Sequence, residues 1–129
     1  MKRKLKTRKL EKDKKTKLFY FKNGEKRLGV HSKISGNFFW IFGDVSNIFG
    51  DVSDISGDVS NISGYVSHIS GDVSSISGDV SKIYGYVLDI SGDVTGIKGD
   101  ITELYGNIKD CEIKDEERKK GINIDDLVD

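Results

Sequence analysis

A seven-residue phrase, Ile-Ser-Gly-Asp-Val-Ser-x in its commonest form, recurs eleven times without interruption between Ile34 and Asp110. The first position always carries an aliphatic residue, and a glycine always stands two residues later. The fifth position is valine except at Phe38, Ile101 and Ile108. A unit this short cannot bury its apolar residues alone, so the units must stack on one another. The phrase therefore constrains the architecture strongly and the biochemical function weakly.

Two regular folds fit this period. The apolar positions are separated alternately by four and three residues, which is the spacing of a coiled-coil seam with valine at a and isoleucine at d. Alternatively, Ile-Ser-Gly-Asp-Val forms a strand in which Ile, Gly and Val point inward, Ser and Asp point outward, and the last two residues turn the corner. The spacing alone does not distinguish a coiled coil from a β-solenoid.

Composition favours the strand. In a helix, glycine costs about 1 kcal/mol relative to alanine, and serine, aspartate and valine cost about 0.5 kcal/mol each, which amounts to about 3 kcal/mol per repeat. The chain contains no alanine or glutamine that would offset this cost. In a strand, the β-branched residues pack well, and an inward glycine lets coils or facing sheets approach. We therefore predict an all-β fold, a short β-solenoid over residues 34–110, with the coiled coil as the alternative. A disordered repeat is disfavoured because Ile and Val recur so regularly.

The exceptions to the phrase bear on the number of repeats per coil. Tyr65 and Tyr86 replace the usual aspartate twenty-one residues apart, and Tyr84 and Tyr105 replace the usual serine at the same interval. Three repeats per coil would stack each pair on one face in adjacent coils. Two repeats per coil would place Tyr65 and Tyr86 on opposite faces. The tyrosine spacing modestly favours the three-sided coil over the two-sided one.

Charge divides the chain into three segments, although the whole chain has a net charge of zero. Residues 1–33 hold fourteen basic and three acidic residues. Residues 34–108 hold two basic and ten acidic residues, and residues 109–129 hold five basic and eight acidic residues. The net charges are therefore +11, −8 and −3. This separation leaves three interpretations of the basic segment: contact with an outside polyanion, contact with an acidic face of its own or a neighbouring solenoid, or a solvated tail, which is favoured.

Residues 1–17 are polybasic, and we expect a disordered tail there. Such a run binds nucleic acid, anionic lipid or an acidic protein, or is simply solvated. Specific recognition of nucleic acid would need aromatic stacking or a presenting scaffold, which the run itself does not supply. The candidate nucleic-acid contacts are Lys2, Arg3, Lys4, Lys6, Arg8 and Lys9.

Both ends of the repeats are predicted to be capped. Residues 18–33 are expected to form a hairpin around Asn23-Gly24, the favoured type I′ pair. Residues 111–129 are expected to form a closing cap with a short helix over 115–120, whose acids come first and whose bases come last, as the helix dipole favours. Gly121 is placed to end that helix, and residues 122–124 alternate like a strand.

The residues that follow the repeats carry a resemblance. Asp110-Cys111-Glu112-Ile113, Glu116-Glu117-Arg118, Gly121-Ile122, Ile124 and Asp126-Leu127-Val128 close the run of Gly-Asp-Val-Ser-x-Ile repeats. In this the chain resembles small heptapeptide-repeat proteins of bacterial and phage genomes, roughly over residues 41–128. The function of those proteins is uncharacterised, so the resemblance implies a repeat domain with a closing cap and no activity. Lys114 departs from the Ser or Thr expected at the helix N-cap.

Residues typical of a catalytic or metal site are sparse. Cys111 stands alone, which predicts a small buried residue and no disulfide framework. His31 and His68 are isolated, and we expect His68 to be a solvated turn residue. The recurring aspartates could bind Ca²⁺, but a solvated acidic face is the favoured interpretation. We predict no catalytic residue, no metal site and no cofactor.

The predicted function is accordingly that of a non-catalytic structural or protein-interaction repeat module. Its partner would be an unknown protein or a second copy of the chain. The alternative is a nucleic-acid-associated protein that binds through its basic segment. No apolar stretch is long enough for a signal peptide or a membrane span, and the lone cysteine agrees with a cytoplasmic location.

Overall fold

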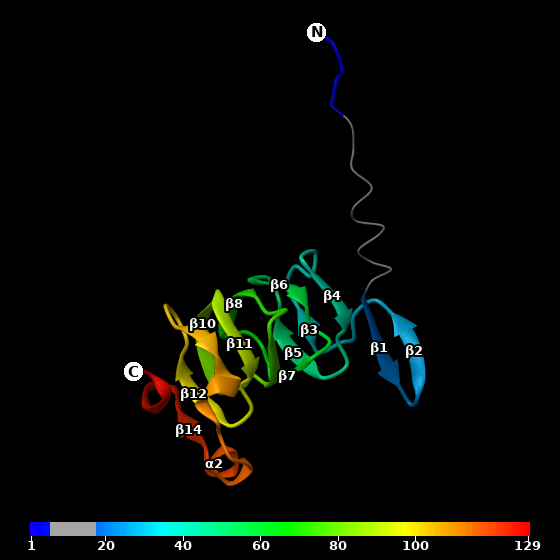
Figure 1. The fold of residues 1–129 in the computed structure, drawn as a ribbon. Coiled ribbons are helices and arrows are strands. Elements are labelled where there is room, and N and C mark those ends of the chain that lie inside the picture. The colour runs from blue at the N-terminus through cyan, green and yellow to red at the C-terminus, as the bar shows by residue number, and fades with distance from the viewer. Residues whose placement is uncertain (6–17) are drawn as a thin grey trace.

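The computed structural model describes residues 1–5 and 18–129, and from residue 18 onward it is an all-β solenoid (Figure 1). The predicted fold class is confirmed. The coiled-coil alternative is wrong, because α2 (Asp115–Lys120) is the only α-helix among the described residues. The repeats instead form short strands whose neighbours are parallel.

Each repeat contributes one strand, and consecutive strands enter opposite sheets. One sheet has eight strands in the order β14-β12-β10-β8-β6-β4-β1-β2, and the other has six in the order β13-β11-β9-β7-β5-β3. The repeat strands are β3 (Ile34–Ser35), β4 (Ile41–Asp44), β5 (Ile48–Asp51), β6 (Ile55–Asp58), β7 (Ile62–Tyr65), β8 (Ile69–Asp72), β9 (Ile76–Asp79), β10 (Ile83–Val87), β11 (Asp89–Asp93), β12 (Ile97–Asp100) and β13 (Tyr105–Asn107).

Two repeats therefore make one coil, and the favoured three-sided coil is wrong. The Ile55 amide donates to the Val52 carbonyl at 3.3 Å, and equivalent bonds close the turns after most repeats. Because each turn returns the chain to the facing sheet, residues three repeats apart lie in different sheets. Tyr65 lies in β7 and Tyr86 in β10, so these two tyrosines do not stack on one face.

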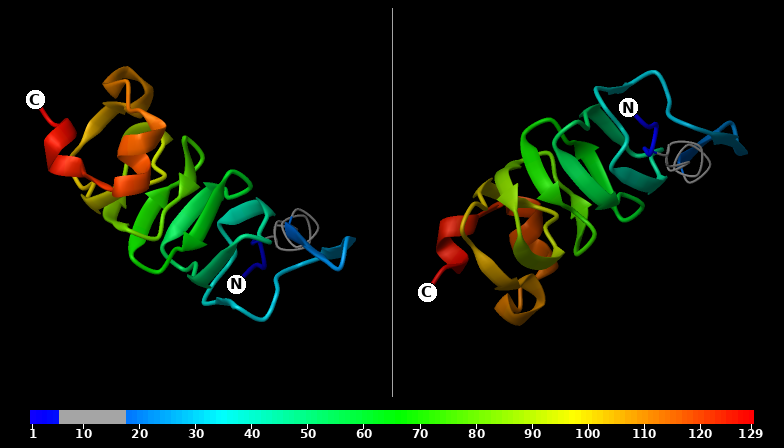
Figure 2. Two further views of the ribbon diagram at one scale, coloured as in Figure 1. Left: turned by 90° about the horizontal axis from the view of Figure 1, so that it is seen from below. Right: turned by 90° about the horizontal axis from the view of Figure 1, so that it is seen from above.

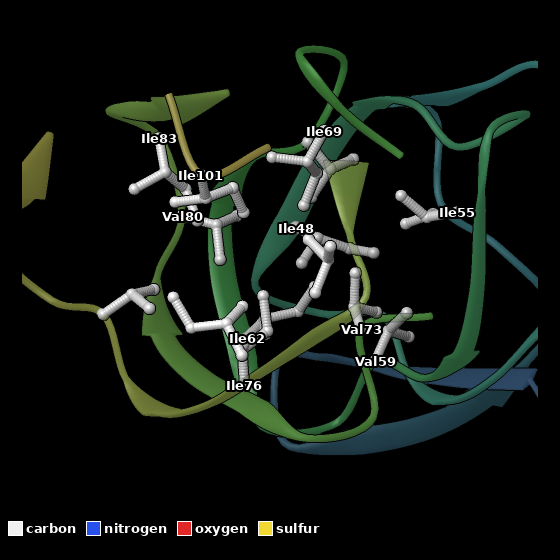
Figure 3. Packing of buried hydrophobic residues seen from close by; sticks show 14 of the residues in the cluster. Ile48, Ile55, Val59, Ile62, Ile69, Val73, Ile76, Val80, Ile83 and Ile101 are labelled. Atoms are coloured by element: carbon white, nitrogen blue, oxygen red, sulfur yellow. The ribbon is translucent and has the colours of Figure 1, made fainter. Parts of the chain in front are cut away.

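The core is a row of isoleucines and valines between the two sheets (Figure 3). The valines at the fifth repeat position are fully buried, and the isoleucines from Ile41 to Ile97 are at most 3% exposed. Each such side chain stabilises the fold by about 1.5–3 kcal/mol on burial. No polar side chain is buried in the described part of the chain, so the interior is uniformly aliphatic.

The repeat glycines were predicted to lie on the inner face so that coils or sheets could approach, but the structure gives a second reason for glycine at this position. Their φ angles run from +82° at Gly36 to +124° at Gly106, a left-handed region that side chains other than hydrogen disfavour. A Cβ on Gly64 would overlap the Ser81 hydroxyl and the Asp79 carboxylate of the next coil. The glycine therefore permits both a special backbone conformation and the close approach of the following coil, rather than filling the inner face.

The N-terminal hairpin extends one sheet instead of lying across the end. Strands β1 (Leu18–Lys22) and β2 (Glu25–Leu28) pair antiparallel around Asn23 and Gly24, whose φ angles are +54° and +80°. Leu18 then pairs in parallel with Gly43 of β4, so the hairpin adds two strands to the eight-stranded sheet. The predicted hairpin is confirmed.

The C-terminal cap also continues the coil. The short helices η1 (Ile108–Cys111) and α2 precede β14 (Ile122–Asn123), which pairs in parallel with β12, and η2 (Ile124–Leu127) follows. Arg118 donates to the carbonyl oxygens of Asp93 at 2.8 Å and Thr95 at 2.7 Å, which ties α2 to the last turns. The predicted helix is confirmed, and the strand predicted over 122–124 spans 122–123.

Candidate interaction surfaces

A hydrogen-bond network on the outside of the solenoid uses the aspartates and hydroxyls of the phrase. Asp51 Oδ1 accepts from the Ser53 amide at 2.9 Å and from the Ser53 hydroxyl at 2.6 Å. The Ser53 hydroxyl oxygen in turn accepts from the Asn37 amide of the preceding coil at 2.9 Å. Equivalent bonds join many other coils, so these residues are structural contacts between coils.

This network also changes the acidity of three carboxyls. Hydrogen bonds from the side chain and backbone of Ser53 lower the pKa of Asp51, and those from Thr102 lower the pKa of Asp100. At Asp93, desolvation raises the pKa, but the bonds from Thr95 and the charge of Arg118 outweigh it and the net shift is downward. The described residues contain no group of three or more His, Cys, Asp or Glu that could hold a metal ion.

Aromatic residues interrupt the network on the outer faces of both sheets. The second and fourth repeat positions usually carry Ser and Asp, and the aromatic side chains that replace them remain partly or largely exposed. Tyr84 is 50% exposed, Tyr86 is 47% exposed and Tyr105 is 85% exposed. The replacements are Phe42, Phe49, Tyr65, Tyr84, Tyr86 and Tyr105.

The largest departure from the phrase follows β10. Leu88 stands where most repeats have Ser or Thr, and it is 62% exposed. It follows Tyr84 and Tyr86 at alternate residues, so the strand geometry directs the two tyrosines to the same outer face. We call Tyr84, Tyr86 and Leu88 the β10 strip. The strip is an apolar surface on the eight-stranded sheet, whose other repeat strands present mainly serines and aspartates.

The other sheet carries a smaller aromatic group. The rings of Phe49 and Tyr65 lie 5.6 Å apart, and Tyr65 lies 5.1 Å from the ring of His68. Phe49 and Tyr65 are register partners in adjacent coils. His68 is exposed, as predicted for a turn residue, although it also contacts this ring stack.

A hollow of about 470 Å³ lies beside the N-terminal hairpin. His31 Nε2 lies 2.8 Å from the Val45 carbonyl, and the His31 ring packs edge-on against Tyr20 at 5.6 Å. Nearby, Lys26 Nζ lies 4.3 Å from the centre of the Phe19 ring. The hollow therefore combines aromatic and cationic groups, and its lining residues are Tyr20, Phe21, Lys22, His31, Ser32, Lys33 and Ser46.

The predicted nucleic-acid residues are only partly described. Lys2, Arg3 and Lys4 are exposed and belong to no strand or helix, whereas Lys6, Arg8 and Lys9 lie outside the described residues. Cys111 was predicted to be buried, and this is wrong. Cys111 is exposed at the end of η1, whose buried residue is Ile108.

The sequence matches no protein-family model, and no curated protein or solved structure is significantly similar to it. The resemblance to small heptapeptide-repeat proteins therefore stays a prediction. In the part of the chain that the structure describes, no helix is long and apolar enough to cross a membrane.

Proposed function

We propose that this protein is a non-catalytic interaction module, a β-solenoid that presents the β10 strip to a protein partner. The observation that carries the proposal is the exposure of Tyr84, Tyr86 and Leu88 together in one repeat, at positions where most other repeats have Ser, Asp and Ser or Thr. The repeats of β6, β8 and β9 act as internal controls, because they fold into the same coil with Ser and Asp at the second and fourth positions. The fold therefore does not require these residues.

The chemistry of the strip suits protein binding. Tyrosine is enriched in the energetically important centres of protein interfaces, because it buries a large apolar ring and keeps a hydroxyl for hydrogen bonding. A strand that is hydrogen-bonded on both sides, as β10 is to β8 and β12, holds the rings in place before binding. Less conformational freedom is then lost when the partner binds.

The test replaces the three residues of the β10 strip with those that the common repeat has at the same positions. The triple variant Tyr84→Ser, Tyr86→Asp, Leu88→Ser should keep the circular dichroism spectrum and cooperative unfolding of the wild type. A photo-crosslinker at residue 82 identifies proteins bound beside the strip in cells that express the chain. The purified partner should then bind the triple variant at least about tenfold more weakly.

A matched control separates the strip from aromatic residues in general. The variant Phe49→Ser, Tyr65→Asp makes the same kind of change on the other sheet and should leave this binding unchanged. Equal binding by the wild type and the triple variant would refute the proposed use of the strip. A cytoplasmic location belongs to the same proposal, because an exposed lone thiol such as Cys111 is most compatible with a reducing compartment.

Nucleic-acid binding is a second candidate function, and the hollow beside the hairpin favours it. Lys22 and Lys33 line this hollow together with Tyr20, Phe21 and His31. Cationic groups beside aromatic rings are what single-stranded nucleic acids bind. Under this hypothesis, Lys22→Glu with Lys33→Glu should weaken salt-sensitive binding of single-stranded RNA or DNA more than Lys82→Glu does. Equal effects of the two variants would reject the hollow as a site.

A further inference from the structure

The last repeat keeps its glycine although no coil covers it. Each repeat glycine from Gly36 to Gly99 lies so close to the segment stacked on it that a Cβ would crowd that segment's atoms. Gly106 has the same left-handed conformation, with φ +124°, but none of the described atoms would lie within 4 Å of its Cβ. The strand that contains it, β13, pairs only with β11 and ends the six-stranded sheet. This end of the solenoid therefore has a vacant strand position.

A hollow of about 430 Å³ adjoins this position. Residues of β13, η1 and η2 line it. These segments lie at the C-terminal end of the solenoid (Figure 2). Its apolar lining includes Leu104, Ile108, Leu127 and Val128, and the acidic residues Glu103 and Asp129 also line it. An apolar side chain from an added strand would enter the hollow much as the isoleucine of each coil enters the core.

We propose that this end binds the amino-terminal segment of a second copy of the chain. Residues 2–5, Lys-Arg-Lys-Leu, add as a further strand beside β13, and Leu5 enters the hollow. Leu5 is fully exposed in the single chain and stands among basic residues. The backbone N–H and C=O groups of residues 2–5 would pair with those on the free edge of β13, as in other cases where a peptide adds a strand to a sheet.

Charge complementarity supports a second copy as the occupant. Residues 1–33 have a net charge of +11, whereas residues 103–129 hold nine acidic and five basic residues, a net charge of −4. Residues 1–17, which hold ten of the fourteen basic residues in residues 1–33, precede β1, and the acidic cap contains β14. Strands β1 and β14 lie toward opposite ends of the eight-stranded sheet. One copy therefore offers its N-terminal residues to the acidic end of the next, and such a head-to-tail contact leaves each pair with one free N-terminal segment and one free hollow for further copies. This contact does not involve the β10 strip, so it is independent of the function proposed above.

The first experiment measures self-association of the full chain by sedimentation velocity. At low salt the average mass of the wild type should rise with concentration, and added salt should reduce it, because the charges are screened. Leu5→Asp should weaken association by about tenfold to a hundredfold, as expected for losing one buried leucine. Leu10→Asp is the matched control, since it makes the same change in net charge outside residues 2–5. Equal weakening by both variants would show a contact of charge alone and overturn the added strand.

The second experiment uses the asymmetry of the contact. Val128→Lys blocks the hollow and should also abolish association, whereas Phe49→Lys, at an exposed apolar residue outside the hollow and the β10 strip, should not. A mixture of Leu5→Asp with Val128→Lys still contains one intact basic segment and one intact hollow. The mixture should therefore form dimers that grow no further. A mixture that stays monomeric would overturn the proposal, as would a wild type that is monomeric at every concentration, whether or not it binds nucleic acid.

Discussion

Strands β8 and β10 are neighbours in one sheet, and they are alike on the inside and different on the outside. Ile69 and Ile83 are 2% and 1% exposed, and Val73 and Val87 are fully buried. On the outer face, β8 follows the repeat phrase, whereas β10 and its turn carry two tyrosines and a leucine. The comparison teaches that the inward residues are kept from strand to strand, whereas the outward positions accept replacements in single repeats and so can carry function.

The two strands also join the neighbouring coil differently. The Ser74 hydroxyl that follows β8 accepts from the Asp58 amide at 2.9 Å, and the Ser74 amide donates to Asp72 at 2.9 Å. After β10, Leu88 has no hydroxyl, β10 extends to Val87, and Val87 pairs with Gly71. A longer backbone pairing thus takes the place of the side-chain bridge, which lets this repeat lose its hydroxyl without losing the coil.

The largest effects should come from the inside, where the two strands should respond alike. Ile69→Ala and Ile83→Ala each remove a buried side chain, and each should lower the free energy of unfolding by about 2–5 kcal/mol. Urea denaturation followed by circular dichroism measures both values. A much smaller loss at Ile83 would contradict the equivalence of the two inner faces.

The glycine position should respond according to whether a coil lies above it. Gly64→Ala places a methyl group against Ser81 and Asp79 in a left-handed backbone and should cost about 3 kcal/mol in unfolding free energy. Gly106→Ala has the same backbone strain but open space, and it should cost about 1–2 kcal/mol. Thermal and urea unfolding of the two variants give the difference, and equal losses would mean that backbone strain alone explains the glycine.

The hydroxyl position should distinguish β8 from β10. Ser74→Ala removes the acceptor of the Asp58 amide and should lower the free energy of unfolding by about 1 kcal/mol. Leu88→Ser introduces the hydroxyl that most repeats have at this position, where the coil already forms without one. It should therefore change the free energy of unfolding by less than about 0.5 kcal/mol. The midpoints of urea unfolding test both values. A large loss for Leu88→Ser would show that the leucine stabilises the coil itself.

The smallest expected effect is a dependence on pH. Bonds from Ser53 hold the pKa of Asp51 below its usual value of 3.8 in the folded protein. A lowered folded pKa means that the contribution to stability is present above the unfolded pKa and is lost as pH falls through the folded pKa. The melting temperature should therefore drop on acidification below about pH 4, and the drop should be slightly smaller in Asp51→Asn. Identical acid profiles for the variant and the wild type would contradict this contribution.

The fold was predictable from the sequence because its two main determinants are local. The alternation of aliphatic residues and the recurring glycine predict short strands, and Asn23-Gly24 predicts the hairpin turn that is observed. The acid-to-base order of residues 115–120 likewise predicts α2, where Glu117 accepts from the Lys114 amide at 3.0 Å in place of a Ser or Thr cap.

The number of repeats per coil was not predictable from the tyrosines, because they do not contact one another across coils. Residues that meet across neighbouring coils are instead sixteen apart in sequence, as in the bond from the backbone N–H of Asp44 to the Ser60 hydroxyl. The contact of Phe49 with Tyr65 has the same separation and could have indicated a two-sided coil. The bridges between coils depend on this register, which a single repeat does not reveal.

The candidate interaction surfaces could not be located from the repeat sequence alone. The replacement residues Tyr84, Tyr86 and Leu88 are visible in the sequence, but their common strand and exposure are not. The same holds for the hollow at the C-terminal end, which β13, η1 and η2 line together. The sequence pattern therefore predicts the repeat strands better than the surfaces formed where the repeat sequence changes.

Because consecutive repeats alternate between the two sheets, the sheet that a strand joins depends on whether an even or an odd number of repeats precedes it. Removing or adding two repeats would restore every later residue to its sheet, because one complete coil is lost or gained. Removing a single repeat would transfer every later strand to the opposite side, and β10 with its tyrosines would exchange faces relative to the N-terminal hairpin. Changes in array length that keep both caps and all surfaces in place are therefore restricted to even numbers of repeats.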